Sequence, residues 1–171
     1  MKEITILSVI TVSNCREDYK GGFTKEEEQI IKEWIRNSYT LNLFSGMSEL
    51  GNIRIDLNFD SKATNFIDVF EFIQDSSIRN FQSIIIDPPY NERYMKIYTK
   101  NQKQKSDFVI FADTRRTTLL FNWIKLIHPE QIILKSFQFY RFEGYNVKGY
   151  ITYAGGYRKP IFLLNNVKKG I

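Results

Sequence analysis

The sequence is poor in the residues that cross-link small folds or bind metals. It contains one cysteine, Cys15, and one histidine, His128, among 171 residues. A disulfide needs two cysteines and a structural zinc needs several Cys or His ligands, so we expect neither. No apolar run approaches the roughly 20 residues that span a membrane, and residues 1–13 lack the cleavage pattern of a signal peptide. We therefore expect a cytoplasmic protein with no membrane contact and no bound metal.

The composition nevertheless supports a folded core. Hydrophobic residues make up 43% of the chain and aromatic residues 15%, which is too much apolar surface for an intrinsically disordered protein. The length fits a single domain. Lys and Arg number 24 against 19 Asp and Glu, so the net charge is 24 − 19 = +5. This excess permits a nucleic-acid partner but is weak support for one by itself.

Short apolar runs alternate with helical patterns, which predicts an α/β fold. One helix is expected over residues 24–37, where Thr24 and Glu27 form a capping box. A second is expected over residues 114–127, capped by Asp113 or Thr114. Several runs are continuously apolar, as in parallel strands covered on both faces.

We predict seven strands in a mostly parallel sheet with an antiparallel C-terminal hairpin over residues 149–166. Residues 4–13 form either an edge strand or an ordered arm. The open sheet binds its ligands at the carboxyl ends of its strands. The predicted strands are residues 41–44, 53–58, 65–68, 82–87, 108–112, 131–140 and 160–166.

The most informative motif is Asp87-Pro88-Pro89-Tyr90, directly after the apolar residues 83–86. Two prolines in succession form a stiff turn, which holds the Asp87 carboxylate and the Pro88 carbonyl as two fixed acceptors. Tyr90 adds a flat face on which a planar ring can stack. When an exocyclic amine donates hydrogen bonds to two such acceptors, its nitrogen is favoured in the pyramidal geometry, in which its lone pair is nucleophilic. The alternative is that these residues simply end a strand.

This tetrapeptide resembles the catalytic motif of the S-adenosylmethionine-dependent amino-methyltransferases, which include DNA adenine-N6 enzymes and RNA guanine-N2 enzymes. The resemblance covers residue 41 to the C-terminus and implies a Rossmann-like class I methyltransferase fold. It implies a catalytic set of Asp87, Pro88, Pro89 and Tyr90, with S-adenosylmethionine as the methyl donor. Residues 1–40 are then an N-terminal arm and helix ahead of the catalytic sheet, with no separate target-recognition domain.

The resemblance also implies where the methyl donor binds. The turn after the first predicted strand would lie under the amino-acid end of the donor. Asp56, in the second predicted strand, would bind the donor's ribose. Asp68 and Val69, at the third predicted strand, would contact its adenine. Asp60 is the alternative to Asp56 for the ribose, and a helix cap is the alternative role for Asp68. The implied cofactor residues are Phe44, Ser45, Gly46, Asp56, Leu57, Asp68 and Val69.

Two departures from the family pattern stand out. Only about eight residues separate Phe44 from Ile53, whereas a crossover between parallel strands usually takes about a dozen and contains a helix. We expect either a single helical turn around residues 47–50 or different strand ends. A glycine-rich loop is also missing, so we assign Phe23, in the Gly-Gly-Phe of residues 21–23, to the methionine end of the donor.

Basic residues follow the catalytic motif, with tyrosines interleaved over residues 91–105. Such a loop is either simply solvated or contacts the phosphates around an extruded base. The candidate nucleic-acid contacts are Arg93, Lys96, Lys100, Lys103, Lys105, Arg115 and Arg116.

The leading hypothesis is methyl transfer to adenine N6 in DNA, with a homodimer or a partner protein supplying target specificity. RNA guanine-N2 or adenine-N6 methylation is the runner-up. Two more hypotheses compete with these: a non-catalytic nucleic-acid-binding module that kept the fold, and a small-molecule or protein methyltransferase.

Overall fold

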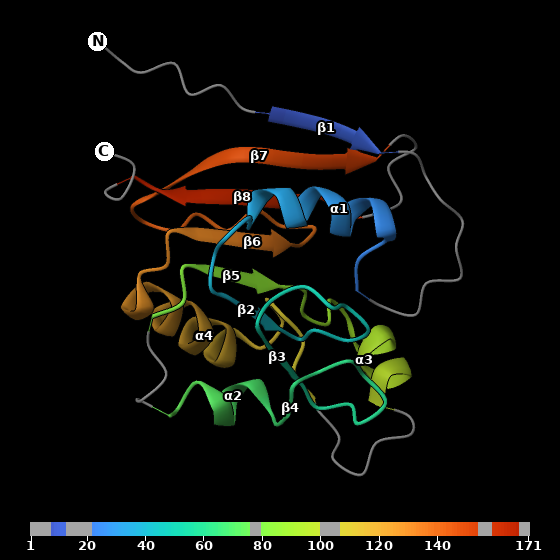
Figure 1. The fold of residues 1–171 in the computed structure, drawn as a ribbon. Coiled ribbons are helices and arrows are strands. Elements are labelled where there is room, and N and C mark those ends of the chain that lie inside the picture. The colour runs from blue at the N-terminus through green and yellow to red at the C-terminus, as the bar shows by residue number, and fades with distance from the viewer. Residues whose placement is uncertain (1–7, 13–21, 76–79, 100–106, 154–158, 168–171) are drawn as a thin grey trace.

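The computed structural model describes residues 8–12, 22–75, 80–99, 107–153 and 159–167. Eight strands form one sheet in the order β1-β7-β8-β6-β5-β2-β3-β4, and only β8 runs against the others (Figure 1). The predicted α/β class and the mostly parallel sheet are confirmed. The strands are β1 (Ser8–Val12), β2 (Thr40–Leu43), β3 (Ile53–Asp56), β4 (Asn65–Phe66), β5 (Ser83–Ile86), β6 (Gln131–Lys135), β7 (Tyr145–Tyr153) and β8 (Ile161–Asn166).

Helices cover both faces of this sheet. One face packs against α1 (Lys25–Trp34), whose Ile31 is fully buried with Ile85 of β5 and Ile133 of β6. The other face packs against α2 (Val69–Phe72) and α4 (Thr114–Ile127), which contribute Phe70 and Phe121 to the larger core cluster. A fourth helix, α3 (Glu92–Thr99), lies towards the end of the sheet where most arrowheads point (Figure 1).

Both long helices begin where the sequence predicts. Thr24 caps α1, and its backbone N–H donates to the Glu27 carboxylate at 2.8 Å while its hydroxyl accepts from the Glu27 N–H at 3.2 Å. Asp113 caps α4 by accepting from the Arg116 N–H at 3.0 Å. Local capping chemistry alone is therefore enough to place these two boundaries.

The predicted strand over residues 108–112 is wrong. Residues 108 and 109 have no regular structure and residues 110–112 form a turn. Phe111 has a left-handed φ of 65°, and the Ile110 N–H donates to the Pro89 carbonyl at 3.0 Å. Phe108 is nevertheless completely buried. A short apolar run indicates burial but does not by itself indicate strand geometry, which explains the error.

Other strand predictions need smaller corrections. The run over 131–140 is a strand only as far as Lys135, and residues 92–99, expected in a loop, form α3. Residues 8–12 settle the open question of the N-terminal segment, because they pair in parallel with β7 as the edge strand β1. The described residues thus contain eight strands rather than seven, and the antiparallel pairing of β7 with β8 is confirmed.

The short link between β2 and β3 contains no helix. Leu50 is buried against the α1 side of the sheet, where it takes part of the space that a crossover helix would fill. The Asn42 side chain donates to the Leu50 carbonyl at 3.1 Å, and the Asn52 side chain accepts from the Thr40 N–H at 2.9 Å. Gly51 has a φ of +90°, and a Cβ there would lie 3.1 Å from the Thr40 carbonyl oxygen. Side-chain amides and a glycine therefore hold this link close to the sheet.

None of the helices in the described part of the chain is long and apolar enough to cross a membrane.

Candidate functional site

The strand order changes direction between β2 and β5. The chain proceeds outward from β2 to β3 and β4, and then returns to place β5 on the opposite side of β2. In open α/β sheets, ligands bind outside the carboxyl ends of the strands at such a reversal. Here those ends are followed by residues 44–46 and residues 87–90, which are the two segments that the sequence singles out.

The Asp-Pro-Pro-Tyr turn lies at this reversal. The Asp87 N–H points to the Leu43 carbonyl of β2 at 3.4 Å, which keeps the motif beside the end of β2. The Tyr90 hydroxyl donates to the Asp87 carboxylate, so the turn folds back on itself. Burial raises the pKa of Asp87, and the nearby charges of Lys135 and Lys159 oppose that rise together with the Tyr90 hydrogen bond. The turn therefore presents a partly desolvated carboxylate whose charge is offset by two lysines.

An aromatic slot adjoins this carboxylate. The rings of Tyr90 and Phe137 meet edge to face with centroids 6.2 Å apart. The Lys159 ammonium lies over the Tyr90 ring and 5.1 Å from the centre of the Phe137 ring. Burial lowers the pKa of Lys159 to about 7, although the Asp87 carboxylate acts in the opposite direction. We call Tyr90, Phe137 and Asp87 the amine slot, because all three interact with the Lys159 amine.

A buried polar network supports the slot from the α1 side. The Lys135 ammonium donates to the Glu27 carboxylate at 3.0 Å and to the Gly22 carbonyl at 2.6 Å. The Tyr153 hydroxyl donates to the same carboxylate, and the Lys135 ammonium lies 4.8 Å from the centre of the Phe23 ring. The carboxyl ends of β6 and β7 are thereby tied to the start of α1. Phe23 itself is buried, and its predicted cofactor contact stays a prediction.

The turn after β2 forms the other half of the reversal. Phe44 and Gly46 have left-handed φ angles of 60° and 52°, and nothing lies within 4 Å of the position that a Gly46 Cβ would take. The Gly46 N–H donates to the Asp56 carboxylate at 2.8 Å, and the Asn58 N–H donates to it at the same distance. Burial raises the pKa of Asp56, and these backbone hydrogen bonds oppose the rise.

This turn has the features that a polar ligand would use. The Ser45 hydroxyl is buried and has no hydrogen-bond partner among the described residues. Buried polar groups without a partner are uncommon and need an explanation such as a ligand or water. The open space at Gly46 and the carboxylate of Asp56 lie beside it. These residues fit the ribose and amino-acid groups of the methyl donor implied by the resemblance.

The three candidate acidic residues, Asp56, Asp60 and Asp68, make different contacts in the structure. Asp56 bonds the Gly46 turn, whereas Asp60 is exposed and its backbone N–H donates to the Asn58 side chain at 2.9 Å. Asp68 caps α2, because its carboxylate accepts from the Phe70 N–H at 2.7 Å. Val69 is buried in the core and Leu57 is half-buried, so their contacts to adenine or ribose stay predictions.

The candidate basic residues that the structure describes lie on two helices, α3 and α4. Arg93 and Lys96 are exposed on α3, where Lys96 pairs with Glu92 at 3.6 Å, and Arg115 is exposed on α4. Arg116 pairs with Asp107 at 2.6 Å and Asp113 at 2.5 Å, and its guanidinium lies over two core rings. Arg116 therefore holds α4 against the 107–113 segment. The remaining candidates lie outside the described residues: Lys100, Lys103 and Lys105.

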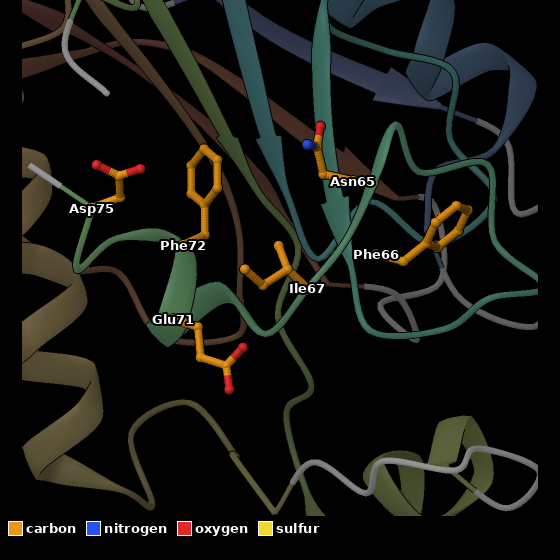
Figure 2. Close-up of a pocket in the computed structure, with 6 residues that line it drawn as sticks. All are labelled: Asn65, Phe66, Ile67, Glu71, Phe72 and Asp75. Atoms are coloured by element: carbon orange, nitrogen blue, oxygen red, sulfur yellow. The ribbon is translucent and has the colours of Figure 1, made fainter. Parts of the chain in front are cut away.

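A separate hollow of about 340 Å³ lies beside β4 and α2. Ile67 lies between Phe72 and Phe66 in its lining, and the Phe66 ring points away from the other two side chains (Figure 2). Two carboxylates, those of Glu71 and Asp75, complete its lining with Asn65. None of these residues belongs to the amine slot, so the hollow is a different feature of the surface.

Three residues near Asp87 are not predicted from the sequence: Lys135, Phe137 and Lys159. Lys135 and Phe137 fall inside the strand predicted over residues 131–140. Because β6 in fact ends at Lys135, the prediction does not place either residue at the end of a strand. A charged residue at the end of an apolar strand, as in "IILK", is the signal that points to Lys135. Lys159 precedes a proline at the start of β8, but no local pattern links it to Asp87.

Comparisons of the chain with family models, curated proteins and solved structures find no match.

Proposed function

We propose that this protein is an S-adenosylmethionine-dependent methyltransferase that acts on an exocyclic amine of a nucleobase. The leading target is adenine N6 in DNA, and guanine N2 or adenine N6 in RNA is the alternative. The observation that carries the proposal is the position of Asp87-Pro88-Pro89-Tyr90, directly after β5 and beside the turn that follows β2.

The strand order supports a Rossmann-like fold. From β4 to β6, the order β4-β3-β2-β5-β6 is that of strands 3-2-1-4-5 in a doubly wound sheet. The antiparallel β8 then enters between β6 and β7, in keeping with the C-terminal hairpin expected for a class I methyltransferase. The edge strand β1 is an addition to that seven-stranded pattern.

The residues at the reversal divide into two groups by chemistry. Ser45, Gly46 and Asp56 offer the donors and acceptors that would hold the amino-acid and ribose parts of the methyl donor. When bound, the donor supplies an electrophilic methyl group on a sulfonium. Asp87 and the Pro88 carbonyl would orient the acceptor amine, and Tyr90 would stack on the base that carries it.

The proton balance requires no strong base. The methylated amine of a nucleobase is a strong acid and loses its proton readily, so positioning is the main task of the protein. Burial raises the pKa of Asp87, whereas the charges of Lys135 and Lys159 act in the opposite direction and favour the ionised form, which accepts hydrogen bonds from an amine.

The test is transfer of labelled methyl groups to duplex DNA, single-stranded DNA and bulk RNA in parallel, followed by identification of the modified nucleoside. Asp87→Ala should lower transfer at least about a hundredfold, the scale of losing a group that stabilises the transition state. Calorimetric binding of the donor should stay largely intact.

Glu143→Ala is the control, because it removes an exposed carboxylate just before β7, at the opposite edge of the sheet from the strand ends that carry the site. Full activity in Asp87→Ala would refute the mechanism. A chain that binds nucleic acid but neither S-adenosylmethionine nor its demethylated product would instead be a binding module.

A further inference from the structure

Lys159 is already in the amine slot. Its ammonium lies over the Tyr90 ring and near Phe137, and its charge interacts with that of the Asp87 carboxylate. The backbone supports this placement, because the Ser136 N–H donates to the Pro160 carbonyl at 3.1 Å and so joins the segment after β6 to the start of β8. Lys135 and Ile161 are opposite each other in the adjoining ladder.

The slot has the chemistry that holds an amine. Aromatic faces attract cations through their electron-rich rings, and a carboxylate adds a charge-assisted acceptor. A planar base stacked on Tyr90 would need the space that the Lys159 ammonium occupies. The Lys159 side chain and a substrate base therefore compete for the face of the Tyr90 ring.

We propose that Lys159 is itself a methyl acceptor, so that the protein methylates its own Lys159 side chain when no substrate fills the slot. This inference rests on the proposed function, because it uses the same methyl donor and the same Asp87-Pro88-Pro89-Tyr90 turn. It adds a modification site to that turn and names an alkylamine as a second class of acceptor.

The chemistry balances without another reactant. The unprotonated Nζ attacks the methyl carbon of the sulfonium, an N–C bond forms, and the C–S bond breaks with its electron pair going to sulfur. The thioether leaves, and the methylated Nζ keeps one positive charge. Its surplus proton passes to water or to the Asp87 carboxylate, after which a second methylation is possible.

The surroundings of Lys159 make the required neutral amine available. An exposed lysine has a pKa of about 10.4 and is almost fully protonated at neutral pH. Burial lowers the pKa of Lys159 to about 7, so near neutral pH about half of the molecules carry the nucleophile, by the definition of the pKa.

The experiment incubates the full chain with S-adenosylmethionine carrying a deuterated methyl group, without nucleic acid, and maps the label by peptide mass spectrometry. Heavy methyl groups should appear on Lys159, and the rate should rise with pH and level off above about pH 8, where the amine is mostly neutral. Added acceptor nucleic acid should slow the labelling, because it competes for the slot.

Two variants serve as controls. Lys159→Arg keeps a cation in place but cannot attack, because a guanidinium stays protonated, and it should abolish the label. Lys125→Arg changes an exposed lysine of α4 and should leave the label on Lys159 unchanged. Asp87→Asn and Tyr90→Ala should each slow the labelling of Lys159.

A second readout needs no methyl donor. Acetylation of the donor-free protein by a small active ester should modify Lys159 with a midpoint near pH 7, whereas ordinary lysines react with a midpoint near about 10.4. A midpoint for Lys159 equal to that of exposed lysines would overturn the proposal.

The remaining outcomes separate this inference from the proposed function. If nucleic acid is methylated while Lys159 stays unmodified, the inference fails and the proposed function stands. If the donor does not bind at all in calorimetry, both fail. If Lys159 is methylated but no nucleic acid is, the inference stands and the nucleobase target is wrong.

Discussion

The Glu27–Lys135 pair allows a quantitative test of how the site is built. The Glu27 side chain is 0% exposed and that of Lys135 is 10% exposed, with 3.0 Å between the charged atoms. Lys135→Met keeps the length and apolar stem but leaves the Glu27 carboxylate without a cation. Removing one partner of a buried ion pair costs about 3–5 kcal/mol, because an uncompensated charge remains. We therefore expect the free energy of unfolding to fall by about 3–4 kcal/mol.

The double variant Glu27→Gln with Lys135→Met should recover most of this loss. The glutamine oxygen can still accept from the Thr24 N–H in the capping box, and no buried charge is left. Urea unfolding followed by circular dichroism gives the free energies of the wild type, of Lys135→Met and Glu27→Gln alone, and of the double variant. The double-mutant cycle from these four values gives an interaction of about 2 kcal/mol or more. An unchanged dependence on urea concentration would show that stability alone has changed.

Lys62→Met is the matched control. It breaks a pair with Glu49 whose N–O distance is even shorter, 2.6 Å, but whose side chains are 47% and 63% exposed. Exposed pairs contribute about 0–1 kcal/mol. If Lys135→Met costs no more than Lys62→Met, burial does not control the strength of these pairs and the reasoning is refuted.

Two further predictions concern the turn after β2 and the cap of α2. Asp56→Asn should weaken S-adenosylmethionine binding in calorimetry by about tenfold to a hundredfold, the range for a lost hydrogen bond to a charged group, and unchanged affinity would remove Asp56 from the site. Because burial raises the pKa of Asp56, the wild type should gain stability relative to Asp56→Asn as the pH falls and the buried carboxylate is protonated. Asp68→Ala should lower the free energy of unfolding by about 1 kcal/mol through loss of the cap, and any accompanying loss of donor affinity would support its predicted contact with adenine.

Much of the framework is predictable because its signals are local. The capping box of Thr24 and Glu27 lies within one helical turn, and the run from Ser83 to Ile86 ends at two prolines. Each of these patterns depends on neighbours a few residues away. Consequently the two long helices and the motif-bearing strand can be located correctly from the sequence.

The strand predictions fail where a segment is apolar and buried but does not have the backbone geometry of a strand. Residues 108–110 are as buried as a central strand, yet they form no strand, and the Ile110 N–H donates to the Pro89 carbonyl instead of to a neighbouring strand. The strand over 131–140 ends at Lys135, since the next ladder partner of β6 is the proline that precedes Ile161. In both cases a contact distant in sequence decides where the regular ladder stops.

The candidate site also depends on contacts between residues that are distant in sequence, which local patterns do not predict. Asp87 and Tyr90 are neighbours in sequence, so their hydrogen bond follows from one tight turn. The charges of Lys135 and Lys159 act on Asp87 because β6 pairs in parallel with β5 and β8 pairs antiparallel with β6, which brings the end of one strand beside the start of another. The order of strands in the sheet therefore determines which cations act on this carboxylate, and the proposed methylation of Lys159 depends on the same order.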